Sequence, residues 1–143
     1  MAKVISMEER RLEKELFFER QVLQTLCLTD IEQSTRALFA SFTTSEQLFE
    51  HTLVPFCTDV ALESYLYGAR FSRLHRVMSD RDIKRAWIKV ENEVVAELLD
   101  FLLYWCAPAS EESLVYSCEH YIDRWWSEGY LNGMRRWRLR LWK

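Results

Sequence analysis

Glycine and proline are scarce in this sequence of 143 residues, which contains three glycines and two prolines. A β-sandwich or β-barrel joins many short strands by turns that draw on both residues. By contrast, 49% of the residues are hydrophobic and 14% are aromatic, which supplies a core for a chain of single-domain length. The composition therefore argues against disorder and predicts one all-α domain over residues 1–143.

The sequence also lacks an export signal and an apolar run of membrane-spanning length. The N-terminus becomes charged at once, and the longest apolar run covers only residues 101–109. No C-x-x-C pair occurs among the four cysteines, which are Cys27, Cys57, Cys106 and Cys118. We therefore expect a cytoplasmic protein in which the cysteines act as small buried hydrophobic residues.

The motifs of common enzyme and metal sites are missing as well. The sequence has no Gly-x-Ser-x-Gly elbow, no glycine-rich phosphate loop and no Glu-x-x-His pair of the kind that builds metal sites in helical bundles. The three histidines are far apart in sequence. No catalytic residue, metal ligand, cofactor or small-molecule ligand can be named from these patterns.

What the sequence does contain is a twelve-residue pattern that occurs twice, at residues 63–74 and 128–139, with seven identical positions. The serines that are expected to begin the two helices, Ser45 and Ser110, are separated by the same 65 positions. This agreement predicts an internal repeat covering about 7–78 and 80–143. The expected architecture is a four- to five-helix bundle built from two helical hairpins related by a pseudo-two-fold axis.

Other helix starts are expected at Ser6, Thr29 and Ser79. Each of these hydroxyl residues is followed three positions later by an acidic residue, as in a capping box. A kink or a restart is expected near Pro55, because proline cannot donate a backbone hydrogen bond within a helix.

A glycine occupies the same helical position in both copies, and glycine in a helix interior costs about 1 kcal/mol relative to alanine. Such a cost suggests a steric reason, because a residue without a Cβ lets another backbone or a large ring approach closely. We expect the two repeat helices to cross at Gly68 and Gly133, or each glycine to receive an aromatic side chain.

The repeated glutamates, Glu63 and Glu128, fall on apolar stripes of their helices, where an unpaired carboxylate is costly to bury. One interpretation is a buried ion-pair network with arginines of either copy. The candidate partners are Arg70, Arg73, Arg135 and Arg138. The alternative is a metal-binding or enzymatic site that uses Glu63 and Glu128 themselves.

The C-terminal stretch combines tryptophans with arginines, whereas the whole chain has a formal net charge of −3. It permits three interpretations: an amphipathic helix that faces the core, a helix that binds the anionic surface of a nucleic acid or a membrane, or a protein interface. The candidate interaction surface consists of Trp125, Trp126, Arg136, Trp137 and Arg140.

Residues 61–69 and 125–141, together with residues 19–23, resemble a small family from bacilli that is sometimes called YbaK-like and is unrelated to the tRNA-editing proteins of that name. The resemblance implies a cytoplasmic bacterial protein and brings no activity or functional residues with it. The function predicted from the residues is a non-enzymatic protein-interaction or regulatory bundle. A protein partner or a homodimer is expected, without a clear nucleic-acid or membrane signal.

Overall fold

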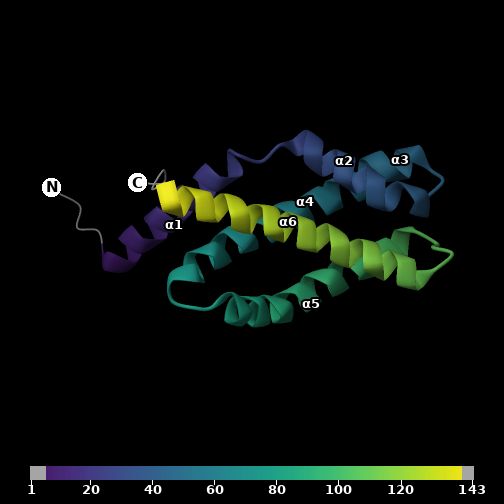
Figure 1. The fold of residues 1–143 in the computed structure, drawn as a ribbon. Coiled ribbons are helices and arrows are strands. Elements are labelled where there is room, and N and C mark those ends of the chain that lie inside the picture. The colour runs from purple at the N-terminus through teal and green to yellow at the C-terminus, as the bar shows by residue number, and fades with distance from the viewer. Residues whose placement is uncertain (1–5, 140–143) are drawn as a thin grey trace.

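The computed structural model describes residues 6–139, and over this range the chain forms helices and short loops without a strand (Figure 1). The predicted all-α bundle is confirmed, whereas the internal duplication stays a prediction. None of the described helices is long and apolar enough to cross a membrane.

The α-helices are α1 (Met7–Leu23), α2 (Leu28–Phe39), α3 (Glu46–Leu48), α4 (Val54–Ser72), α5 (Asp80–Trp105) and α6 (Glu111–Leu139). The other helical turns are the 3₁₀ turns η1 (Ala40–Phe42) and η3 (Arg73–Arg76), and the π-helical turn η2 (Phe49–Leu53).

Serine side chains begin four of the helical segments, as the sequence predicts. Each serine hydroxyl accepts a hydrogen bond from the backbone N–H three residues further on, which satisfies a donor that the helix leaves open. These residues are Ser6, Ser45, Ser79 and Ser110. The start expected at Thr29 is misplaced, because α2 already begins at Leu28 and its cap residue, Cys27, makes no side-chain hydrogen bond.

The helices α4 and α6 run side by side in the same direction through the middle of the molecule (Figure 1). Glycine makes this contact unusually close. A Cβ added at Gly68 would lie 2.0 Å from the carbonyl oxygen of Trp126, and one added at Gly129 would lie 1.9 Å from that of Tyr65. At Gly133 the nearest atom would be the Ser72 hydroxyl, at 2.4 Å. Backbone therefore meets backbone along this crossing.

The face of α4 that enters the core consists mainly of small side chains. Ala61, Ser64, Gly68, Ala69 and Ser72 are all buried there. The larger apolar residues Tyr67 and Phe71 of the same helix are only partly buried. On α1, Phe18 and Val22 enter the core, whereas Leu12 and Leu16 are exposed.

Two buried tyrosines tie the helices together by hydrogen bonds. The Tyr121 hydroxyl of α6 donates to the carbonyl oxygen of Cys57 at 2.9 Å and lies 2.8 Å from the hydroxyl of Thr35 on α2. The Tyr65 hydroxyl of α4 lies 2.7 Å from the Thr25 hydroxyl and accepts from the Asn132 amide at 2.6 Å. Because a buried hydroxyl without a partner is destabilising, these bonds fix how α1, α2, α4 and α6 pack.

Near Pro55, where a kink or a restart of the helix is expected, the helix does not restart; a π-helical turn, η2, lies immediately before α4. The proline itself stands in the first turn of α4, where its missing N–H is tolerated. The chain from α3 through η2 to α4 therefore continues as one helical segment rather than breaking into two.

Candidate functional site

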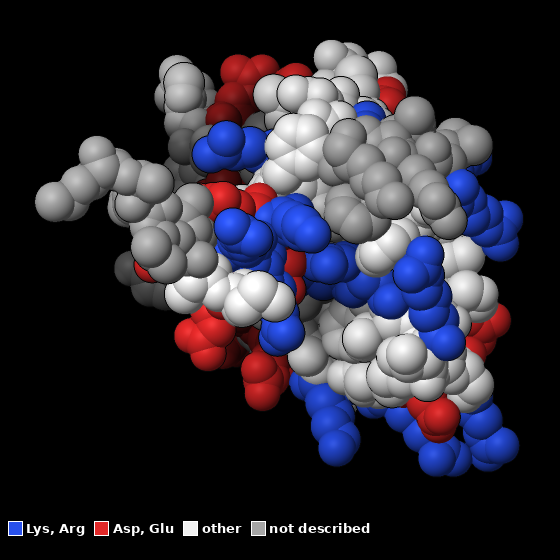
Figure 2. All heavy atoms as spheres, turned by 90° about the vertical axis from the view of Figure 1, so that its left-hand side faces the viewer, with Lys and Arg blue, Asp and Glu red and all other residues white. Residues whose placement is uncertain are grey.

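A hollow lies at the end of the bundle where α1, the α4–η3 junction and the last turns of α6 meet. It encloses about 500 Å³, a volume typical of small-ligand pockets. Figure 2 faces this end of the molecule and shows Lys and Arg side chains gathered around a hollow, with acidic side chains on one flank. The arginines that line it are Arg70, Arg73 and Arg76.

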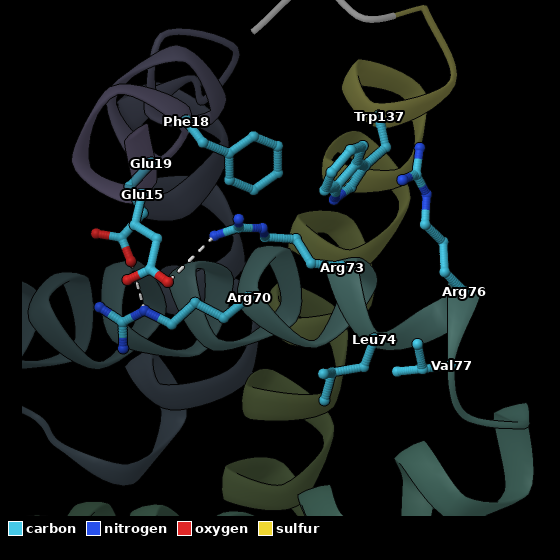
Figure 3. A pocket seen from close by; sticks show the side chains of 9 residues that line it. All are labelled: Glu15, Phe18, Glu19, Arg70, Arg73, Leu74, Arg76, Val77 and Trp137. Carbon is cyan, nitrogen blue, oxygen red and sulfur yellow. Dashed lines mark hydrogen bonds and ion pairs between the residues drawn. The ribbon is translucent and has the colours of Figure 1, made fainter. Parts of the chain in front are cut away.

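A tryptophan of α6 lines one side of the hollow. Trp137 of α6 lies between Arg73 and Arg76 (Figure 3). The guanidinium carbons lie 5.7 Å and 4.3 Å, respectively, from the centre of the nearest Trp137 ring, and that of Arg73 is also 5.4 Å from the Phe18 ring. These are cation–π distances, and stacking orients a guanidinium while leaving N–H groups at its edge.

The local structure explains why both arginines reach the same tryptophan. Arg73 and Arg76 are the first and last residues of the 3₁₀ turn η3. In a 3₁₀ helix, side chains three positions apart eclipse one another, so the two arginines project to the same side. The tight turn thus places two cations against one aromatic residue of α6.

Two glutamates of α1 supply the acidic flank. The Arg70 side chain donates to Glu19 at 2.5 Å, and Arg73 lies 3.7 Å from Glu15 (Figure 3). The hydrogen bond to Glu19 raises the pKa of Arg70 above its ordinary value, so this guanidinium stays charged. Among residues 6–139, Arg76 forms no ion pair, which leaves the pocket with one more cation than it has anions.

A smaller hollow of about 120 Å³ adjoins the first and shares Arg73, Arg76 and Trp137 with it. Its wall also contains Arg138 and His75, and no acidic side chain lines it among the described residues. His75 Nδ1 lies 3.1 Å from Asp80 at the start of α5. We refer to the two hollows together as the arginine pocket.

The buried ion-pair network expected around the repeated glutamates does not form, because Glu63 and Glu128 are both exposed. The buried face of α4 passes through Ser64 and Tyr65 instead, so Glu63 turns outward. Partial desolvation and the nearby charge of Glu97 raise the pKa of Glu63, and the charge of Arg70 opposes this shift.

The predicted arginine partners are divided among different environments. Arg70 and Arg73 pair with glutamates of α1, Arg138 lines the smaller hollow, and Arg135 is exposed. The structure therefore brings Arg70 and Arg73 together with Glu19 and Glu15, not with the repeated glutamates. Over residues 6–139, no group of three or more His, Cys, Asp or Glu side chains is placed to hold a metal ion.

The expected interaction surface is also divided. Trp125 and Trp126 are buried, with only 3% and 6% of their surface exposed, because they face the interior of the bundle rather than solvent. Trp126 stacks on Trp87 and Tyr130 with ring centres 5.3 Å and 5.1 Å apart. Half-buried Arg136 donates to Gln21 of α1 at 2.9 Å, and Arg140 lies outside the described residues.

Sequence reasoning missed Arg76, Phe18 and the two glutamates of α1 as pocket residues. A usable signal was present for the arginines, since Arg70, Arg73 and Arg76 recur every three positions at the end of a helix. A second missed signal was the Gly-x-x-x-Gly spacing of Gly129 and Gly133, which allows close helix approach. Neither signal identifies the opposite wall of the pocket, because α1 is distant in sequence.

Three cysteines are buried and Cys27 is exposed, which corrects the expectation that all four are buried. Burial raises the pKa of Cys118 to about 12 and raises that of Cys57 still further. Because the thiolate is the reactive form, these thiols are unreactive at neutral pH.

We expect one thiol to react rapidly with a chromogenic disulfide reagent in the native protein at pH 8, and four after denaturation. A Cys27→Ser variant should lose the rapid phase and keep the slow ones, because it removes the exposed thiol alone. Rapid reaction of two or more native thiols would contradict the burial of Cys57, Cys106 and Cys118.

The fold and pocket together define an all-helical bundle with a basic cavity, lined by arginines and a tryptophan, at one end. The sequence family described as "Protein of unknown function (DUF2521)" matches residues 1–142, and the chain belongs to this family. The chain is also 25% identical over 146 aligned positions to a protein described as "Uncharacterized protein YbaK" from Bacillus subtilis (strain 168), with 99% of each chain covered. The resemblance noted from the sequence is thereby confirmed. No solved structure matches the chain.

Proposed function

We propose that this protein is a non-enzymatic regulatory binding protein that recognises an anionic ligand or partner group in the arginine pocket. The observation that carries the proposal is the pair of cation–π contacts that Arg73 and Arg76 make with Trp137, so that two cations lie against one aromatic residue. An oriented guanidinium loses little conformational freedom on binding, so its hydrogen bonds to a carboxylate or phosphate are strong.

The pocket chemistry suits binding better than proton transfer. Arginine remains protonated in proteins and cannot act as a general base. The two carboxylates of the pocket, Glu15 and Glu19, already face the guanidinium groups of Arg73 and Arg70. The proposal therefore retains the non-enzymatic role predicted from the sequence but moves it from Trp125 and Trp126 to the arginine pocket.

The test is an Arg76→Glu variant, measured by calorimetry against a panel of small phosphates and carboxylates. We expect the wild type to bind at least one of these anions. The variant should bind the same anion at least about tenfold more weakly, because a charged hydrogen-bond donor is replaced by a repelling carboxylate. The wild-type affinity should also fall as salt concentration rises.

A Lys89→Glu variant is the matched control, since it makes the same charge change on an exposed face of α5 and lines neither hollow. Its affinity should remain within about twofold of wild type, given the screening between distant surface charges. Equal losses in both variants would show a general charge effect and remove the proposed site. Absence of binding by the wild type to every anion in the panel would contradict the function itself.

A further inference from the structure

The smaller hollow differs from its neighbour in the balance of charge on its wall. Arg73, Arg76, Arg138 and His75 line it, and no described carboxylate does. The larger hollow, in contrast, includes Glu15 and Glu19. An anion with several oxygen atoms would lie beside three guanidinium groups and an imidazole in the smaller hollow, and beside no carboxylate of the described residues that line it.

We infer that the smaller hollow is a phosphate subsite and that the ligand of the arginine pocket is a small phosphomonoester whose remainder carries hydroxyl groups. This inference rests on the proposed function, because it specifies the ligand of the same site. Three guanidinium groups match a phosphate better than a single carboxylate, since a phosphomonoester presents three terminal oxygens and up to two negative charges.

Contacts with neighbouring side chains keep three of these donors in place. Arg73 and Arg76 are oriented by their contacts with Trp137, and Arg138 follows that tryptophan directly on α6. His75 is held by Asp80, whose Oδ1 is also 3.4 Å from the Tyr130 hydroxyl. A phosphate in this hollow would therefore link η3 to the last turns of α6.

The larger hollow specifies the rest of the ligand. Leu74 and Val77 give it an apolar side, and Glu15 and Glu19 give it acceptors on the opposite element, α1 (Figure 3). A carboxylate oxygen that already faces an arginine can still accept from a hydroxyl group, because each carboxylate offers about four acceptor positions. A phosphorylated polyol, as in a sugar phosphate, satisfies both hollows at once.

Calorimetric titrations with ribose 5-phosphate, ribose, inorganic phosphate and glutarate test this inference. Ribose 5-phosphate should bind at least about tenfold more tightly than inorganic phosphate or glutarate, because only the sugar phosphate engages both hollows. Ribose, which carries no charge, should bind most weakly. Arg138→Ala should weaken ribose 5-phosphate about tenfold and change glutarate binding by less than about twofold. Arg135→Ala is the control, since this exposed arginine of the same helix lines neither hollow.

The possible failures are distinguishable. If glutarate binds as tightly as ribose 5-phosphate and Arg138→Ala changes neither, the phosphate subsite is wrong and the anion-binding function stands. If ribose 5-phosphate binds but Arg135→Ala weakens it as much as Arg138→Ala, the subsite is wrongly placed. If no anion binds, both the inference and the proposed function fail.

Discussion

Replacing Gly129 by alanine should lower the free energy of unfolding by about 3 kcal/mol, although alanine is the better helix former by about 1 kcal/mol. The added methyl group would lie 1.9 Å from the carbonyl oxygen of Tyr65. Because that atom belongs to the backbone of α4, no side-chain rotation can relieve the overlap. The helices α4 and α6 would have to separate, which would loosen the contacts along their shared face.

Urea denaturation followed by circular dichroism measures this effect, with Glu128→Ala as the control. Glu128 is the exposed neighbour of Gly129 on the same helix, so its replacement should change stability by less than about 0.5 kcal/mol. Gly133→Ala should be milder than Gly129→Ala, because the first atom met is the Ser72 side-chain hydroxyl. A Gly129→Ala protein as stable as wild type would show that the two backbones do not approach this closely.

Replacing Trp126 by alanine should lower the free energy of unfolding by about 3–5 kcal/mol, the cost typical of removing a large buried aromatic side chain. Trp126 is 6% exposed and stacks between Trp87 and Tyr130, so its loss leaves a cavity among α4, α5 and α6. Denaturation followed by circular dichroism again provides the measurement, since it does not depend on tryptophan emission.

The control for Trp126 is Tyr116→Ala, which removes another large aromatic side chain from the same helix. Tyr116 is 67% exposed, and its replacement should change stability by less than about 0.5 kcal/mol. The comparison also decides between the two interpretations of Trp126. A stable Trp126→Ala protein with impaired partner binding would restore the tryptophan as an interaction residue, whereas the structure places it in the core.

Much of the fold could be predicted because it depends on local signals. The scarcity of glycine and proline predicted the helical class. The serine caps depend only on neighbouring residues, and they predicted four of the helix starts. The buried face of α4 could not be assigned in the same way. Large apolar side chains usually mark a core face, but here close helix approach favours Ser64, Gly68 and Ser72 and displaces Tyr67 and Phe71 from the centre.

The candidate site was less predictable because it depends on tertiary contacts. An exposed arginine on a helix resembles any other in sequence, and Arg76 differs only because the η3 turn aims it at Trp137. Glu15 and Glu19 become pocket residues only when α1 packs beside the end of α4. The repeated glutamates drew attention because they recur, but recurrence in a helix does not determine which side of it faces the core.

The π-helical turn η2 has a consequence for the two copies of the sequence pattern. A π-helical hydrogen bond spans one residue more than an α-helical one, so η2 changes the direction in which the following residues of α4 face; α6 continues as an α-helix from its start after Ser110 without such a turn. Along the crossing Tyr65 lies against Gly129, and Gly68 lies against Trp126 and Tyr130, so residues at matching positions of the two copies do not face one another.

Matching residues of the two copies have unequal surroundings. Tyr65 is buried and bonded to Thr25 and Asn132, whereas its counterpart Tyr130 reaches the surface beside Asp80. One repeated sequence thus serves as an internal brace in α4 and helps to build the basic end of the molecule in α6.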